Sequence, residues 1–368
     1  MNETSRRAAS GCALHDTSSG SPAGGGDALD RASVGRVRAL RWWLVLVLLL
    51  SAACGGRSSG ERDLGLPGDA AGNFDTNVSV DATDDTGADT SADTSLYPPP
   101  NKNLVGTVGG DQTLDVATWN LRQFPATAST IKTTADLVAS MDLDLIAVQE
   151  ITDDAAFDEL VARLPGYAGV LSTHVFPSGE QQKDGLLYKT SAVKVSNVEL
   201  LFEGEYDIFP RPPVQALVTV ESSSVDFTII VVHLKAGVQQ ENRDKRRLAI
   251  KALETYVRSR VDGPFDNQIM ILGDFNQDLD DDDSGLIWGP FLDNADRYSV
   301  LTVATKNAGK ESYLPFHRML DHIVITSALD QEAGNEAPLV PDLNVQLNNY
   351  QDLVSDHLPV VLRMPITP

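Results

Sequence analysis

Several apolar segments of this chain end abruptly on a side chain that can carry chemistry, and this pattern constrains the fold more than any other feature. A run of roughly four to eight apolar residues closed by turn-forming residues is typical of a buried β-strand. The polar residues at the ends of these runs are Asn120, Glu150, His233, Lys235, Asp274, Asn276, Asp321, Asp356 and His357. Because strand ends in a packed sheet meet at a common edge, we expect these side chains to converge.

Each of these residues, taken alone, has a simpler explanation. Asp274 could close the strand "QIMILGD" with an Asx turn. Glu150 could begin a helix in "EITDDAAFDEL", where acids interact favourably with the helix dipole. Together, however, the residues are carboxylates, amides and imidazoles, with no nucleophilic Ser or Cys motif. This set suits a hard divalent metal and acid–base chemistry on a phosphate group.

The order of the segments predicts the fold class. Strands are expected at 113–120, 143–150, 184–190, 193–203, 213–222, 226–234, 268–274, 319–326 and 355–364, and helices at 130–141 and 240–260. Helices interleaved with strand-rich hairpins, where both sheet faces need cover, predict an α/β sandwich of two sheets packed face to face.

The charge of this part of the chain restricts its partners. Residues 101–368 carry 21 Lys and Arg against 39 Asp and Glu, a net charge of −18. Such acidity argues against purely electrostatic attachment to nucleic acid, for which a basic face is expected. It allows a phosphate substrate if cations lie in the cleft, and acidic groups around a divalent ion are one way to provide them.

The first 54 residues are expected to direct export. Arg36, Arg38 and Arg41 precede an uncharged stretch from Trp42 to Ala53, which suits the apolar region of a signal peptide. Small residues directly before Cys54 resemble a bacterial lipoprotein cleavage site, so cleavage before Cys54 and a lipid anchor on it are predicted. The alternative is an ordinary signal peptide cut nearby. Cys12 would be removed either way, so the folded part cannot rely on disulfides.

Residues 55–105 are expected to form a disordered acidic tether. The stretch "DATDDTGADTSADTS" repeats Asp, Thr, Ser, Ala and Gly, and such a composition with few apolar groups predicts an extended, self-repelling chain. A calcium-binding repeat is the weaker alternative, since no fixed spacing recurs. Residues 106–368 are then the catalytic domain. The predicted location is outside the cytoplasm, as a membrane-anchored lipoprotein in the periplasm or on the cell surface, or as a secreted protein.

The motifs "WN", "QE", "HLK", "GDFN", "LDH" and "SDH", in this order, resemble the endonuclease/exonuclease/phosphatase superfamily, which includes deoxyribonuclease I. The resemblance spans about residues 113–364. It implies a four-layer α/β sandwich, in which two packed and mainly antiparallel sheets are flanked by helices, with the active site at one edge. Within the superfamily, "HLKAG" and "FPRPP" are most similar to secreted bacterial nucleases and to deoxyribonuclease I.

The resemblance also implies a metal and a phosphate site. Glu150 is the main ligand that it implies for Mg²⁺, with Asn120 and Asp356 close by, and Mn²⁺ or Ca²⁺ would be possible substitutes. Arg211 in "FPRPP" would bind phosphate, or would be a turn residue placed by the flanking prolines. Lys235 would either contact phosphate or be a solvated residue at a strand end.

The catalytic roles follow from the same resemblance. Asp274 would hold or activate the attacking water, and Asn276 would position it or a phosphate oxygen. His357, oriented by Asp321, would contact the scissile phosphate. His233 would stabilise charge in the transition state or protonate the leaving oxygen.

The predicted function is a metal-dependent phosphodiesterase that uses in-line attack by water, most simply an extracytoplasmic nuclease acting on DNA or RNA. Alternatives are a lipid phosphodiesterase of the sphingomyelinase kind, a phosphomonoesterase on inositol phosphates, and a surface lipoprotein that only binds. The expected partners are nucleic acid as substrate and a membrane through Cys54, with no protein partner predicted.

Two charged segments each allow two interpretations. The segment "DLDDDD" (278–283) is either a calcium site or a solvated loop, and "RDKRR" (243–247) is either a patch that steers a polyanion or the solvated face of a helix.

Overall fold

The computed structural model describes residues 96–265, 267–334 and 336–366. The predicted export signal, Cys54 and the tether up to residue 95 lie outside the described residues. Among the helices in the described ranges, none is long and apolar enough to cross a membrane.

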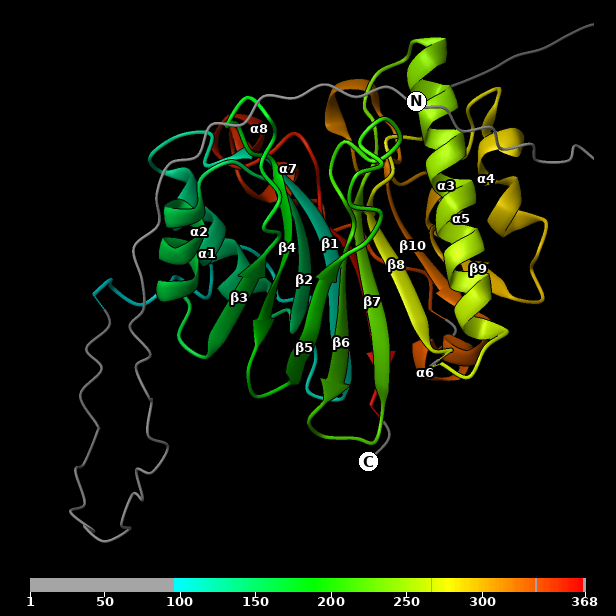
Figure 1. Ribbon diagram of the computed structural model, residues 1–368. Helices are drawn as coiled ribbons and strands as arrows, with labels where there is room; N and C mark the ends of the chain where they lie inside the picture. Colours follow the sequence, from blue (N-terminus) through cyan, green and yellow to red (C-terminus); the bar gives the residue numbers. More distant parts are fainter. Residues whose placement is uncertain (1–95, 266, 335, 367–368) are drawn as a thin grey trace, which may run out of the picture. The chain divides into compact units, whose positions relative to one another are not determined.

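Two sheets form the centre of the fold (Figure 1). The first has the strand order β11-β1-β2-β4-β3, with β11 at Val360–Pro365, β1 at Thr113–Phe124, β2 at Leu145–Ile151, β4 at Lys183–Lys189 and β3 at Tyr167–Leu171. The second has the order β5-β6-β7-β8-β10-β9, with β5 at Val193–Leu200, β6 at Val214–Val220, β7 at Asp226–His233, β8 at Ile269–Asp274, β10 at Asp321–Thr326 and β9 at Tyr298–Val300. The pairs β1–β2 and β7–β8 are parallel and the other named pairs are antiparallel, which confirms the predicted mainly antiparallel sandwich.

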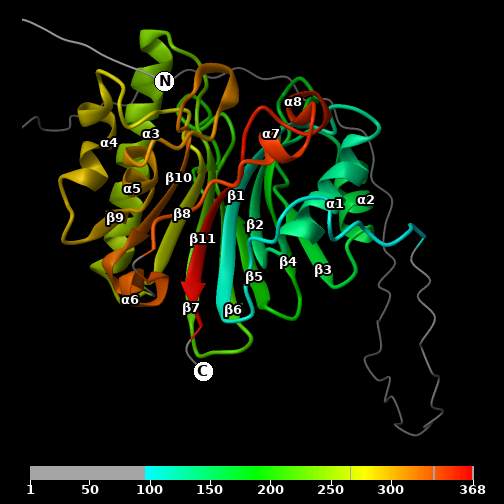
Figure 2. The same cartoon turned by 180° about the vertical axis from the view of Figure 1, so that it is seen from behind.

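Helices cover the outer faces of both sheets (Figures 1 and 2). On the first sheet lie α1 (Thr130–Met141) and α2 (Asp154–Ala162); on the second lie α3 (Gln240–Val261), α4 (Ser284–Leu292) and α5 (Thr302–Asn307). Short helical turns fill the connections before and after β10: η1 (Leu314–Phe316), η2 (Ser327–Leu329), α6 (Asp330–Ala333), α7 (Leu343–Gln346) and α8 (Tyr350–Leu353). The four layers predicted from the sequence are therefore present.

Strand β7 shows why the sequence forms these layers. Its apolar run is continuous because both faces of the strand are buried. Ile229 and Val231 belong to the core between the two sheets, whereas Ile230 and Val232 belong to the second core, beneath α3 and α4. Since successive side chains of a strand point to opposite faces, one strand serves two hydrophobic cores.

The structure corrects several predicted boundaries. Strand β11 begins at Val360, so Ser355, Asp356 and His357 lie in the turn before the strand and not within it. Glu150 lies in β2 and does not begin a helix, because α2 starts later and Asp153 is its N-cap, accepting a hydrogen bond from Ala156 N at 3.1 Å. Strands β3 and β9 and helices α4 and α5 were not predicted.

The strand register brings distant motifs together. In the second sheet, His233 at the end of β7 is paired with Asp274 at the end of β8, and Asp274 is paired with Asp321 at the start of β10. In the first sheet, Asn120 is paired with Gln149, beside Glu150. The parallel pairs β1–β2 and β7–β8 thus end at the edge where the polar residues gather.

Gly273 permits the close approach of β7 and β8 next to Asp274. Its φ is 147°, and a Cβ atom here would lie 1.9 Å from the carbonyl oxygen of Val232. We expect Gly273→Ala to destabilise the fold by about 3 kcal/mol or more, because the strands would have to separate, and chemical denaturation would measure the loss. Gly285→Ala is the matched control, since its added methyl would have no atom within 4 Å. Equal stability of the two variants would contradict this account.

Candidate active site

Asp274 is the central side chain of the candidate site. It is 1% exposed, accepts a hydrogen bond from Asn120 Nδ2 at 3.0 Å, and accepts another from the backbone N–H of Asn276 at 2.8 Å. Its Oδ2 lies 3.6 Å from His233 Nε2 and 3.9 Å from His357 Nε2. Burial, and then the charge of Asp321, raise the pKa of Asp274 to about 7, so this carboxylate can take up a proton near neutral pH.

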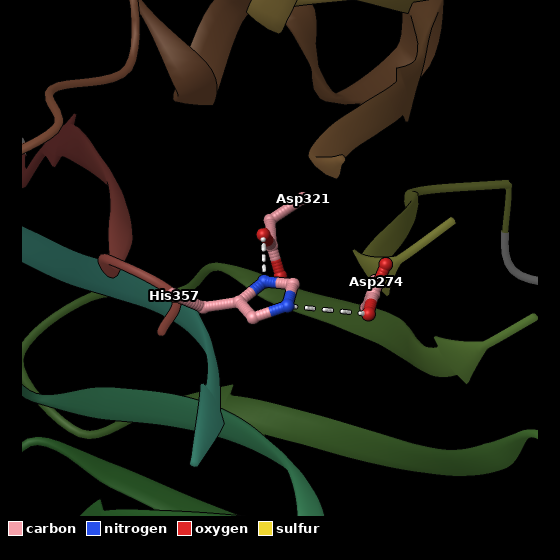
Figure 3. A group of neighbouring side chains, drawn as sticks. All are labelled: Asp274, Asp321 and His357. Atoms are coloured by element: carbon pink, nitrogen blue, oxygen red, sulfur yellow. Dashed lines mark hydrogen bonds and ion pairs between the residues drawn. The ribbon is translucent and has the colours of Figure 1, made fainter. Parts of the chain in front are cut away.

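His357 forms a buried pair with Asp321 on its far side from Asp274. Figure 3 shows the imidazole between the two carboxylates, and its Nδ1 lies 2.7 Å from Asp321 Oδ2. Burial acts to lower the pKa of His357, but the charge and hydrogen bond of Asp321, together with Asp274 and Asp356, raise it to about 10. The ring is therefore a cation at neutral pH, and it can face a phosphate as a fixed positive charge.

Buried hydrogen bonds fix both members of this pair. Ser312 Oγ accepts the backbone N–H groups of Leu320, at 3.0 Å, and of Asp321, at 3.1 Å. The carbonyl of His357 accepts hydrogen bonds from Tyr350 Oη at 2.5 Å and from Trp119 Nε1 at 3.3 Å. The turn that carries His357 is thus anchored to the core between the sheets.

His233 is a neutral imidazole in this environment. It is 2% exposed, and burial, with the nearby charge of Arg211, lowers its pKa well below the usual range. Nε2 lies between Glu150 Oε1, at 3.8 Å, and Asp274 Oδ2, at 3.6 Å. Since the charged form is disfavoured, His233 can act on a phosphate oxygen through an N–H group and is a poor charged acid.

The structure does not bring Arg211 and Lys235 to the catalytic pocket. Arg211 lies behind it, where Nε donates to the carbonyl of His233 at 3.0 Å and Nη2 to the carbonyl of Leu234 at 2.8 Å. Its Nη1 donates to Gln182 Oε1 at 2.6 Å. A guanidinium whose donors support the end of β7 is not directed at a bound phosphate. Lys235 is half-buried and lies outside the pocket lining.

Glu150 and Asn120 hold an irregular piece of β1. Asn120 Nδ2 donates to Glu150 Oε1 at 3.2 Å, Asn120 Oδ1 accepts from Arg122 N at 2.9 Å, and Glu150 Oε2 accepts from Gln123 N at 3.0 Å. Arg122, Gln123 and Glu150 have φ values of 44°, 47° and 64°, a left-handed conformation that is uncommon for such residues. Side chains of the site therefore stabilise a bulge that directs Arg122 to the pocket.

These residues surround a pocket of about 360 Å³. Of the sequence-predicted site residues, those that line it are Glu150, His233, Asp274, Asn276, Asp356 and His357. Asn120 and Asp321 lie directly behind them, bonded to Asp274 and His357. The strand ends therefore converge as expected, except that Lys235 lies outside the pocket lining.

Sequence reasoning missed the cations of the pocket, which are Arg122, Arg246 and Arg318. Arg246 belongs to "RDKRR", yet it is only 3% exposed and donates through Nη1 to the carbonyls of Lys235 and Gly237, both at 2.8 Å. It shares the buried face of α3 with Ala249, Ile250, Leu253 and Val257. That helical spacing is the signal that could have identified Arg246 as a buried side chain and not part of the solvated face of the helix.

The acidic segment "DLDDDD" is held by cations of the protein itself. Asp278 lies 3.1 Å from Lys306 Nζ, Asp283 lies 3.4 Å from Arg243 Nε, and Asp281 pairs with Arg318. Asp278 also accepts the backbone N–H of Met319 at 3.0 Å. The segment is a salt-bridged support for Arg318, which differs from both the calcium site and the fully solvated loop considered above.

Two sets of side chains could hold a metal ion. Ligand atoms of Asp274, Asp321 and His357 all lie within 4.8 Å of one another, but a protonated His357 bound to Asp321 is a poor ligand. Glu150 and Asp356 face the same pocket and are partly exposed, with side-chain exposures of 17% and 21%. Together with Asp274 they supply the oxygen donors that a hard divalent cation prefers, so the residues present fit such an ion.

The sandwich and this site define a class of proteins, the hydrolases of phosphoester bonds. A model of the Endonuclease/Exonuclease/phosphatase family matches residues 117–357, and the chain belongs to that family. The match extends over the motifs from β1 to His357. A search of curated proteins finds no match.

Solved structures support the fold. A humanized D. rerio TDP2 carrying 14 mutations is 13% identical, with a TM-score of 0.52 over 69% of this chain and 99% of that one. D. rerio TDP2 with a single-strand DNA product is 15% identical, with a TM-score of 0.51 over 70% and 100%. The human Nocturnin catalytic domain with bound sulfate is 18% identical, with a TM-score of 0.51 over 70% and 94%. At these identities the likeness is one of fold.

Proposed function

We propose that this protein is a Mg²⁺-dependent phosphodiesterase, and that it is a nuclease acting on DNA or RNA outside the cytoplasm. The observation that carries the proposal is the position of Asp274 between a neutral and a charged imidazole, in an acid-lined pocket that also contains three arginines. Such a pocket combines a proton acceptor, fixed positive charge and oxygen donors for a cation. One neighbour in fold carries a single-strand DNA product, which supports nucleic acid as the substrate.

The residues of the pocket have separate roles in the proposed reaction. Glu150 and Asp356 would hold Mg²⁺, with Asn120 orienting Glu150, and the bound ion would supply positive charge to the phosphate. Asp274 accepts the proton of the attacking water, a role that suits a carboxyl whose pKa is near neutrality. Asn276 contributes its side-chain oxygen at the pocket wall while its Nδ2 donates to the carbonyl of Leu234.

Charge on the phosphate is stabilised by groups already in place. His357 presents a cation that Asp321 maintains, and Arg122, Arg246 and Arg318 add positive charge at the pocket wall. Because these charges are fixed in place before the substrate binds, little reorganisation is needed in the transition state. Water attacks phosphorus and gives a proton to Asp274, the phosphoester P–O bond breaks, and the leaving oxygen takes up a proton from solvent water.

Removal of the metal should abolish activity. We expect full-length protein treated with EDTA to release no acid-soluble nucleotides from DNA or RNA, and added Mg²⁺ to restore release. Glu150→Gln should raise the Mg²⁺ concentration for half-maximal activity at least about tenfold, because a neutral amide is a weaker ligand. Glu221→Gln, an exposed acid on the turn between β6 and β7, is the control. Full activity in EDTA would refute the proposed use of metal.

A second candidate is a lipid phosphodiesterase. Phe316 is 72% exposed and Val238 is 68% exposed, and both line the mouth of the catalytic pocket. Exposed apolar side chains at a pocket entrance favour a substrate with an apolar group. Release of phosphocholine from sphingomyelin, without release of nucleotides from DNA or RNA, would select this alternative.

We also propose that Cys54 carries a lipid and that the acidic segment after it tethers the domain to the membrane. The support is the sequence pattern before Cys54 and the composition of residues 55–105. Metabolic labelling with palmitate should mark the protein, and Cys54→Ser should abolish the label. An unlabelled protein recovered from the medium would favour a secreted form.

A further inference from the structure

A second and larger hollow adjoins the catalytic pocket. This groove has a volume of about 1150 Å³ and is lined by Arg122, Gln123, Pro125, Ala126, Thr127, Thr152, Phe176, Gly179, Glu180, Gln181, Gln182 and Asp352. The lining comes from the end of β1 and the segment between β1 and α1, the residue after β2, the loop between β3 and β4, and α8. The groove is large enough for a nucleoside.

The groove and the catalytic pocket share Arg122 and Gln123. Their left-handed backbone, held by Asn120 and Glu150, places these two residues at the boundary between the hollows. A group esterified to a phosphate in the catalytic pocket would therefore reach the groove directly across them.

The two hollows differ in charge. The catalytic pocket is lined by three arginines and two histidines against three acids, whereas the groove lining has one cation, Arg122, against two acids, Glu180 and Asp352. Arg122 is already engaged, since Nη1 donates to the carbonyl of Gln351 at 2.7 Å and Nε lies 3.8 Å from Asp356. A second phosphate entering the groove would meet two carboxylates. The groove therefore disfavours a polyanionic backbone and accepts an uncharged group.

The remaining lining suits a polar ring system. Gln123, Gln181, Thr127 and Thr152 provide amides and hydroxyls, and Phe176 provides a ring. The wall that carries Phe176 is preformed: Phe176 N donates to the carbonyl of Glu180 at 2.8 Å. His174 packs edge-on against Phe176, with centroids 5.2 Å apart, and stacks on Tyr206 at 5.3 Å. A rigid aromatic surface beside hydrogen-bonding groups is typical of nucleobase recognition.

We propose that this groove binds the uncharged nucleoside on one side of the scissile phosphate, so that the preferred substrate is a short single strand and not a duplex. The smallest good substrate is then a dinucleoside monophosphate, with its one phosphate in the catalytic pocket. This inference rests on the proposed nuclease function and specifies its substrate class.

Substrate length tests the proposal in the full-length protein with Mg²⁺. We expect kcat/KM per scissile bond for a dinucleoside monophosphate and for a single-stranded hexanucleotide to agree within about threefold, and duplex DNA to be cleaved more slowly. The dependence on salt should correspond to about one phosphate contact, a logarithmic slope near −0.7. A kcat/KM that rises steeply with length, together with a steep salt dependence, would overturn the proposal, because further phosphates would then be bound.

Variants of the groove test the assigned residues. Phe176→Ala should raise KM for the dinucleoside monophosphate about tenfold. The kcat/KM for the dinucleoside monophosphate should therefore fall relative to the kcat/KM for methyl p-nitrophenyl phosphate, which is too small to fill the groove. Gln123→Ala, which leaves the aromatic wall intact, should change the ratio in the same direction. Phe265→Ala, at a remote and 56% exposed position, is the control. Unchanged ratios in both groove variants would overturn the proposal.

A charge reversal distinguishes repulsion from poor fit. Glu180→Lys should improve KM for the hexanucleotide but not for the dinucleoside monophosphate, and Glu221→Lys should improve neither. Improvement of both substrates by Glu180→Lys would contradict the neutral occupant.

A binding measurement tests the groove independently of catalysis. Calorimetry of the dinucleoside monophosphate with Asp274→Asn protein, with and without Phe176→Ala, needs no turnover. If Phe176→Ala weakens binding and the wild-type protein cleaves no phosphodiester, the nuclease function is overturned and the groove as a nucleoside site is supported. Affinity that Phe176→Ala leaves unchanged would overturn the groove alone.

Discussion

Asp274→Asn is expected to reduce kcat by about 10³-fold to 10⁴-fold while the protein stays folded. The amide keeps the size of the carboxyl group and can still accept the N–H of Asn276, but it cannot take a proton from water. It also removes the negative charge beside Nε2 of His233 and of His357. Single-turnover cleavage of DNA or RNA at saturating Mg²⁺ would measure the chemical step directly.

The same substitution should stabilise the metal-free protein above neutral pH. The pKa of Asp274 is raised from 3.8 to about 7 in the folded state, so the folded protein holds this proton more tightly than the unfolded chain does. The stability that the protonated form of Asp274 contributes is fully present below about pH 4 and is lost as the pH rises through 7. Because asparagine carries no such cost, we expect a gain of up to about 4 kcal/mol at pH 8 in EDTA.

Asp282→Asn, in the exposed part of the acidic segment, is the control for both measurements. It should leave activity and thermal stability unchanged. If Asp274→Asn retained more than about a tenth of the activity, another group would have to accept the proton from water.

Asp321→Asn is expected to have the second largest effect, a loss of about 10²-fold to 10³-fold in kcat at pH 8. The amide oxygen can still accept the hydrogen bond from His357 Nδ1, but the charge that keeps the ring protonated is gone. The pKa of His357, which Asp321, Asp274 and Asp356 together raise to about 10, should then fall, because only Asp274 and Asp356 remain to oppose the effect of burial. The variant should therefore be nearest to wild type at pH 5.5 and should lose activity as the pH rises.

The pH dependence of stability gives an independent measurement of this pair. A histidine whose pKa is raised on folding contributes stability that is fully present below its unfolded pKa of about 6.5 and is lost as the pH rises through about 10. Denaturation of the metal-free wild type should show that loss between pH 6.5 and 10, and Asp321→Asn should not. NMR titration of the His357 ring would assign the group.

A second acid–histidine pair serves as the control. His317 lies 2.8 Å from Glu311, but the side chain of His317 is 79% exposed, so solvent screens the pair. Glu311→Gln should change neither kcat nor the pH profile. An identical pH profile for wild type and Asp321→Asn would show that His357 does not act as a cation.

The apolar runs of the sequence were sufficient to predict most strands and the convergence of their ends. Runs such as "IIVVH" and "IMILGD" have few alternatives to buried strands, and the polar residue that follows each marks the edge. Strand β3 was missed because "YAGVL" is short and only half-buried, so neither a continuous apolar run nor a clear alternation marks it. The turn containing Ser355 to His357 was predicted as part of β11 because the apolar residues Leu358 and Pro359 connect it directly to the strand.

The cations of the site could not be predicted from strand patterns, because tertiary contacts place each one. Arg122 depends on a bulge held by side chains of another strand, and Arg318 depends on the carboxylates of residues 278–283. Arg211, which the prolines around it made conspicuous, instead supports the backbone of His233 and Leu234. Arg246 is a partial exception, since helical periodicity would have identified it as a buried side chain of α3, although not as part of the site.

The division of β7 between two cores also affects how this protein can change over generations. Ile229 and Val231 share their surroundings with the first sheet, and Ile230 and Val232 share theirs with α3 and α4. A substitution at one of these positions would be compensated by changes in only one of the two cores. The set of residues with which each position of β7 is energetically coupled would therefore alternate with a period of two residues. Lineages could then repack one interface at a time while the end of β7, and the histidine that it carries, keeps its place.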